Sequence, residues 1–149
     1  MDAFALNLSR GRLPVIQLSI QPRQGPEHHF RLGQALAPLL HGGISIVGSG
    51  AATHNLGAFA DDEAPPPNWV RAFDGWLAMT IHANDIASLL AYRTLAPYAR
   101  QNHPSEEHLL PLFVALGAGG SGQRIHRGFT HRILSMAAFR FDGSPEGAG

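Results

Sequence analysis

The sequence contains no cysteine, which excludes disulfide bonds, thiolate metal sites and a cysteine nucleophile. Charged residues are also scarce, at 15% of the 149 residues, and the 11 basic side chains balance the 11 acidic ones. A neutral chain of this kind lacks the basic surface that binds nucleic acid or anionic lipid, so we expect neither partner. Any bound metal must be held by nitrogen and oxygen ligands.

Long apolar runs are missing as well. No stretch approaches the roughly 20 residues needed to cross a bilayer, and residues 1–12 lack the charged start and apolar stretch of a signal peptide. We therefore expect a cytoplasmic protein without membrane contact. The length and the hydrophobic fraction of 44% suit a single domain with a substantial core.

Hydrophobic periodicity predicts an α/β fold. Residues 13–21, "LPVIQLSIQ", and 44–47, "ISIV", are typical of buried strands, and residues 28–41 between them have helical spacing. A strand, helix and strand in this order predict a parallel sheet covered by helices. Further along the chain we expect helices over 68–81, 85–100 and 105–117, a closing strand over 133–141 and a flexible polar tail over 142–149.

Histidine is the residue in excess, with nine copies, and it is both the commonest nitrogen ligand and a group that titrates near neutrality. One copy, His54, lies in "GSGAATHNL", directly after the predicted strand 44–47. Loops at the carboxyl ends of parallel strands are where open α/β sheets bind ligands, and Asn55 could orient the imidazole. The alternatives are a solvated histidine at an ordinary strand exit, or a phosphate cradle whose G-x-G-x-x-G pattern fails at Thr53.

Two more histidines bracket a predicted helix start in "HPSEEH". With Ser105 as the N-cap, His108 falls in the first turn, where the positive helix end disfavours a protonated imidazole. His103 precedes a proline, which favours an extended backbone, and a break between the two histidines lets both point to one site. The alternative is a pair of surface histidines at a helix entry.

These blocks, together with "HHFRLGQALAPL" and "LSMAAFRF", come in an order that resembles the class III extradiol ring-cleaving dioxygenases. This group contains the protocatechuate 4,5-dioxygenase catalytic subunit, and the chain is most similar to its DOPA-4,5-dioxygenase-like branch, from about Leu13 to Phe141. The resemblance implies a central, mostly parallel sheet between two layers of helices. It also implies a non-haem metal, usually Fe(II) and in some members zinc, a catecholic aromatic substrate and O₂.

The resemblance implies roles for individual residues. His54 matches the histidine that acts as acid and base on the catechol, and His103 and His108 match further active-site histidines, which we expect to bind the metal. Ser49 and Asn55 in the "GSGAATHNL" block are expected to contact the substrate. Which of the three histidines bind the metal stays open.

The chain departs from the family in its first part. Members carry two more metal-binding histidines in an N-terminal half, in "HGSP"-like and "DHG"-like segments, and residues 1–12 contain no histidine. We therefore expect residues 1–141 to correspond to the C-terminal half of such an enzyme, with an exposed sheet edge at 13–21. The expected partner is a second copy of the chain or a complementing N-terminal half. The alternative function is a catalytically silent α/β module that binds a partner or a small ligand.

Overall fold

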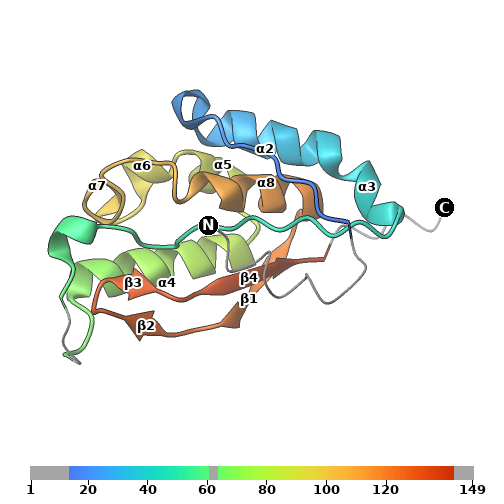
Figure 1. Ribbon diagram of the computed structural model, residues 1–149. Coiled ribbons are helices and arrows are strands. Elements are labelled where there is room, and N and C mark those ends of the chain that lie inside the picture. The colour runs from blue at the N-terminus through green and yellow to red at the C-terminus, as the bar shows by residue number, and fades with distance from the viewer. Residues whose placement is uncertain (1–13, 61–63, 143–149) are drawn as a thin grey trace.

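The computed structural model describes residues 14–60 and 64–142, as helices joined by long connections and followed by short strands (Figure 1). The elements are η1 (Pro22–Gln24), α2 (Gly25–Leu36), α3 (Pro38–His41), η2 (Leu56–Ala58), α4 (Asn68–His82), α5 (Ile86–Leu90), α6 (Tyr92–Leu95), α7 (Ala99–Asn102), α8 (Leu110–Gly119), β1 (Gly122–His126), β2 (Phe129–Thr130), β3 (Leu134–Ser135) and β4 (Ala138–Phe141). In Figure 1, α2 lies on one side of α8, and the strands lie on the other side, beside α4. None of the helices in the described ranges is long and apolar enough to cross a membrane.

The strands form two small antiparallel sheets. β1 pairs with β4, with a shift in register between Arg124 and His126, and β2 pairs with β3. The predicted closing strand over 133–141 is present but divided into β3 and β4. β1 was not predicted from the sequence.

The predicted central parallel sheet is not found among the described residues, so this part of the expected three-layer fold is not confirmed. Residues 14–21 and 44–47 form no strand hydrogen bonds. Their side chains are largely exposed, and Ile16 is 87% exposed. Apolar and β-branched composition favours an extended backbone, but a strand also needs a neighbouring backbone to pair with. Within the described residues, neither segment has one.

The helices follow the prediction most closely where one apolar face repeats over several turns. α4 begins at Asn68, as expected, whereas the helix predicted over 85–100 is divided into α5, α6 and α7. Ala96 precedes a proline and is extended, and Tyr98 has a positive φ of 55°, so a continuous helix is interrupted there. The last helix begins at Leu110, not at Ser105, whose hydroxyl donates to the Glu107 carboxylate at 2.7 Å and caps no helix.

The hydrophobic core lies between α4, α8 and the short helices. Its members are fully buried aromatic and aliphatic side chains, chiefly Phe73, Leu77, Ile81, Leu89, Tyr92, Phe113 and Leu116. On the opposite face of α8, α2 approaches so closely that a Cβ on Gly33 or Gly117 would overlap a backbone oxygen of the other helix. Glycine at these two positions therefore sets the distance between α2 and α8.

We predict opposite effects for two glycine-to-alanine substitutions in helices. Gly117→Ala forces α2 away from α8 and should lower the free energy of unfolding by about 1–3 kcal/mol. Gly75→Ala lies in α4 with no atom within 4 Å of the added Cβ, and should raise it by about 0.5–1 kcal/mol through helix propensity. Urea unfolding of both variants measures the difference. Equal stabilities would mean that α2 and α8 are not tightly packed.

Candidate functional site

The segment that carries His54 crosses the molecule between α8 and the C-terminal strands (Figure 1). Four hydrogen bonds attach the end of this segment to residues 101–108. Ala51 N donates to the His108 carbonyl at 2.8 Å, His103 Nε2 lies 2.9 Å from the Ala52 carbonyl, His54 N donates to the Asn102 carbonyl at 3.0 Å, and Asn55 Nδ2 donates to the Gln101 carbonyl at 2.6 Å. The two histidine blocks of the sequence are therefore held side by side.

His54 and His108 stack on each other in this arrangement. Their ring centroids are 3.4 Å apart and their planes differ by 20°. Burial lowers the pKa of His54, and the positive charge that His108 acquires on protonation lowers it further. The stack therefore favours a neutral His54, which is the form that can accept a proton. The His108 side chain is 40% exposed and open to a ligand.

His103 occupies a different environment from the other two histidines. Its side chain is fully buried and packs against the rings of Phe73 and Tyr92. Because a carbonyl oxygen only accepts, the contact with Ala52 places a hydrogen on Nε2, and Nδ1 has no hydrogen-bond partner among the described residues. Burial lowers the pKa of His103 to about 4, so the ring is neutral at pH 7. From this buried position, His103 contacts the His54 segment through the Ala52 carbonyl.

The two polar residues expected to contact substrate also differ from each other. Ser49 is exposed and, with His108, lines a cavity of about 410 Å³ between residues 46–52, α8 and β4. The Asn55 amide is engaged at both ends, because Nδ2 donates to Gln101 and Oδ1 accepts from Gly57 N at 3.1 Å. Asn55 thus secures the loop after His54, and Ser49 is the polar side chain that faces open space.

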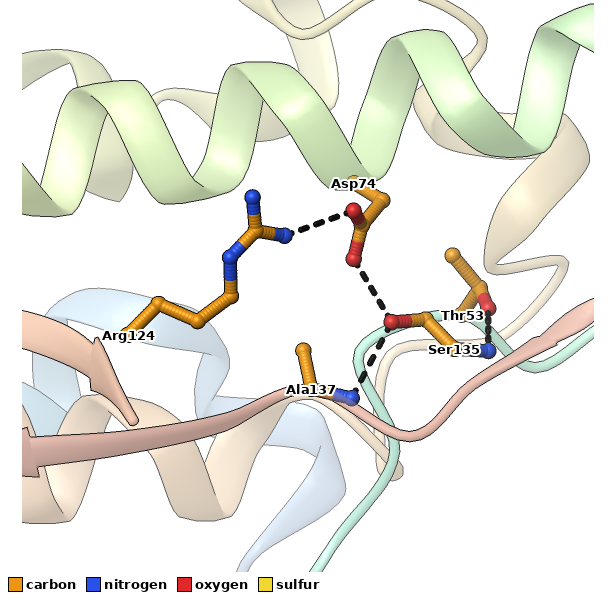
Figure 2. Close-up of polar contacts among 5 residues, drawn as sticks. All are labelled: Thr53, Asp74, Arg124, Ser135 and Ala137. Carbon is orange, nitrogen blue, oxygen red and sulfur yellow. Dashed lines mark hydrogen bonds and ion pairs between the residues drawn. The ribbon is translucent and has the colours of Figure 1, made fainter. Parts of the chain in front are cut away.

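The sequence interpretation missed a buried polar chain beside this loop. Thr53 bonds to β3, Ser135 of β3 bonds to Asp74 of α4, and Asp74 pairs with Arg124 of β1 (Figure 2). One signal was available in the sequence. Asp74 has the helical spacing of the apolar residues Val70 and Leu77, so it places a carboxylate on the buried face of α4.

The described residues do not by themselves form a metal site. Within 14–60 and 64–142, no three His, Cys, Asp or Glu side chains gather closely enough to hold a metal ion. The stack offers two imidazoles, and the known site geometries need at least three protein ligands.

Comparison with known families decides the relationship of the chain. The model of the family described as the catalytic LigB subunit of aromatic ring-opening dioxygenase matches residues 6–142. The chain belongs to this family. The match covers nearly the whole chain and both histidine blocks, and it confirms the resemblance to the class III extradiol dioxygenases.

Curated relatives of the chain carry consistent names. It is 39% identical over 135 residues to "4,5-DOPA dioxygenase extradiol" of Beta vulgaris, a match that covers 87% of this chain and 49% of the relative. It is 30% identical over 114 residues to the protein of that name in Escherichia coli strain K12, covering 71% of this chain and 40% of the relative. The chain thus spans about half the length of the three plant relatives to which it is 39% identical.

A solved structure supports the same fold. The crystal structure of an uncharacterized protein from Escherichia coli K12 matches with a TM-score of 0.74 at 28% identity. The match covers 86% of this chain and 55% of the other. Most of this chain therefore shares the arrangement of helices and strands in Figure 1 with a solved structure.

We predict that the buried His103 makes stability depend on pH. Its pKa falls from 6.5 in the unfolded chain to about 4 in the folded one, so the unfolded state binds more protons between these values. Stability should be constant above pH 7 and decrease as the pH falls from 6.5 towards 4. At about 1.4 kcal/mol per pH unit, the difference amounts to roughly 3 kcal/mol.

Urea unfolding at pH 7.5, 6.0 and 5.0 tests this dependence. The control is His103→Gln, which removes the titrating group and should flatten the profile over the same range. A variant that loses as much stability as the original protein between pH 7.5 and 5.0 would assign the dependence to another group.

Proposed function

We propose that this chain provides the acid–base part of an extradiol ring-cleaving dioxygenase site, which acts with O₂ on a catecholic aromatic of DOPA type. The observation that carries the proposal is the stack of His54 on His108 beside the cavity lined by Ser49. Membership of the ring-opening dioxygenase family and the names of the curated relatives support the substrate class.

His54 takes the role of proton acceptor in this proposal. A catechol hydroxyl at the open side of the stack transfers its proton to a ring nitrogen of His54, whose pKa is lowered by burial and by His108. Because the same surroundings disfavour the imidazolium, the ring readily returns the proton to the ring-opened product. The exposed Ser49 hydroxyl can donate to a catecholate oxygen and hold the substrate against the cavity wall.

The metal of such an enzyme needs more ligands than the described residues provide. We propose that the accessible His108 is one ligand for Fe(II), with zinc as the alternative. His103 was also expected to be a ligand, but its bond to Ala52 supports a positioning role instead. The remaining ligands have to come from outside the described residues. For this reason, we assign the chain a share of the site, and not the complete one.

A second candidate function, a module that binds a partner polypeptide, is favoured by the exposed apolar side chains of two segments. Apolar side chains along the two segments predicted to be strands are 51–87% exposed, namely Val15, Ile16, Leu18, Ile44 and Val47. Exposed apolar segments with unpaired backbone groups are typical sites for strand addition. We propose that this surface binds a complementing polypeptide or a second copy of the chain. The dioxygenase and the partner-binding function are compatible if the partner supplies the remaining ligands.

Catechol-dependent oxygen uptake tests the dioxygenase proposal. After addition of Fe(II), the chain together with the part of the Beta vulgaris relative that it does not cover should consume oxygen and release a yellow ring-opened product. His54→Gln should lower the rate by about 10²–10⁴. His82→Gln, at an exposed histidine at the end of α4, is the matched control and should retain full activity. Oxygen uptake that His54→Gln leaves unchanged would contradict the proton-acceptor role.

Association in solution tests the partner-binding surface. Ile16→Asp places a charge in the exposed apolar segment and should abolish complex formation measured by sedimentation velocity. Met79→Asp is the control, since Met79 is 67% exposed on α4 and outside that segment. If the chain stays monomeric at all concentrations, with or without the complementing half, the proposal that these exposed segments bind a polypeptide is wrong.

A further inference from the structure

The buried polar chain beside the His54 loop joins segments that are far apart in the sequence (Figure 2). The Thr53 hydroxyl donates to the Ile133 carbonyl at 2.7 Å. It also accepts from the Ser135 amide at 2.7 Å. The Ser135 hydroxyl donates to Asp74 Oδ1 at 2.6 Å, and Arg124 donates to Asp74 Oδ2 at 2.7 Å. The loop is thereby connected to β3, α4 and β1.

The buried carboxylate of Asp74 determines the direction of the hydrogen bond that it receives from the Ser135 hydroxyl. Asp74 is 6% exposed and only accepts, so the hydroxyl hydrogen of Ser135 is committed to it. The Ser135 oxygen is then left to accept from Ala137 N at 3.2 Å. Arg124 compensates the charge, without which a buried carboxylate would be costly. Ser135 therefore has a single rotamer that satisfies its neighbours.

The Thr53 hydroxyl makes hydrogen bonds to β3 and the residue before it that the backbone of a neighbouring strand would otherwise make. The carbonyl of residue 133 and the amide of residue 135 are two positions apart, which is the spacing at which a strand presents both groups to one neighbour. Thr53 is fully buried and satisfies both groups with one hydroxyl, as donor to the first and acceptor from the second. Valine at this position would leave two buried backbone groups without this partner.

The loop that carries His54 is consequently held from two sides. On one side, backbone bonds connect it to residues 101–108, including the bond from His54 N to Asn102. On the other side, the Thr53 hydroxyl anchors it to β3, one residue before His54. The stack of His54 on His108 lies at the end of this segment, next to both anchors.

We propose that Thr53, Ser135 and Asp74 are positioning residues that keep His54 stacked on His108. The proposal rests on the proposed function only for the role of His54 in proton transfer; the positioning itself is a statement about geometry. It differs from a purely stabilising role, in which loss of the bonds would lower the stability of the fold and leave the two rings in place.

Ring-proton shifts of the histidines distinguish the two roles. Each ring of a stacked pair shifts the proton resonances of the other upfield, and this shift disappears when the rings separate. We would record carbon–proton correlation spectra of the histidine rings at one fixed pH and assign the signals with His54→Gln and His108→Gln. Thr53→Val should abolish the upfield shift of both rings, and Thr53→Ser, which retains the hydroxyl, should preserve it.

Thr80→Val is the matched control. The Thr80 hydroxyl is also buried and donates to the Trp76 carbonyl at 2.7 Å, but this bond lies within α4 and away from the loop. Thr80→Val should leave the His54 and His108 signals unaltered. Ser135→Ala retains both Thr53 bonds and loses the link to Asp74, so a partial loss of the upfield shift is expected.

Unchanged ring shifts in Thr53→Val would overturn the proposal. If Thr53→Val does not fold, unchanged shifts in Ser135→Ala would overturn it equally. Because the measurement needs no turnover, it is independent of the dioxygenase assay. Should oxygen uptake be insensitive to His54→Gln while Thr53→Val still separates the rings, the positioning role stands and the proton-acceptor role fails.

Discussion

The candidate site depends on the placement of one short segment, residues 51–55. Each of its residues bonds to a distant part of the chain, four of them to residues 101–108 and Thr53 to β3. Such long-range bonds cost chain entropy, and the packing of α4 and α8 beneath the segment compensates for it. The stack of His54 on His108 and the cavity beside Ser49 both follow from this placement.

Burial divides the three histidines of the site into two kinds. His103 lies among Phe73 and Tyr92, where its low pKa makes it a neutral structural group bound to Ala52. His54 and His108 lie nearer the surface, where one imidazole lowers the proton affinity of the other. A pair of accessible imidazoles is suited to proton transfer, but within residues 14–60 and 64–142 no group of three ligands for a metal accompanies it.

Several features could be predicted from the sequence because they depend on nearby residues. The apolar repeat of α4 predicted its position. The histidine blocks pointed to His54, His103 and His108 as candidates for one site, and the structure stacks His54 on His108. Two predictions were wrong: a continuous helix over 85–100, which is interrupted at Pro97, and a helix start at Ser105, which lies at Leu110 instead. In the first case, the residue before a proline left the helix, and in the second, Ser105 bonded to the Glu107 side chain instead of capping a helix.

Family membership and the chemical character of the site were determined by the sequence alone, because the histidine blocks and their order are properties of the chain itself. Whether the segments 14–21 and 44–47 become strands is decided in three dimensions, since a strand exists only with a neighbour to pair with. The role of His103 and the chain of bonds from Thr53 to Asp74 also required the tertiary structure. Burial and contacts between residues up to 82 positions apart leave little trace in local sequence.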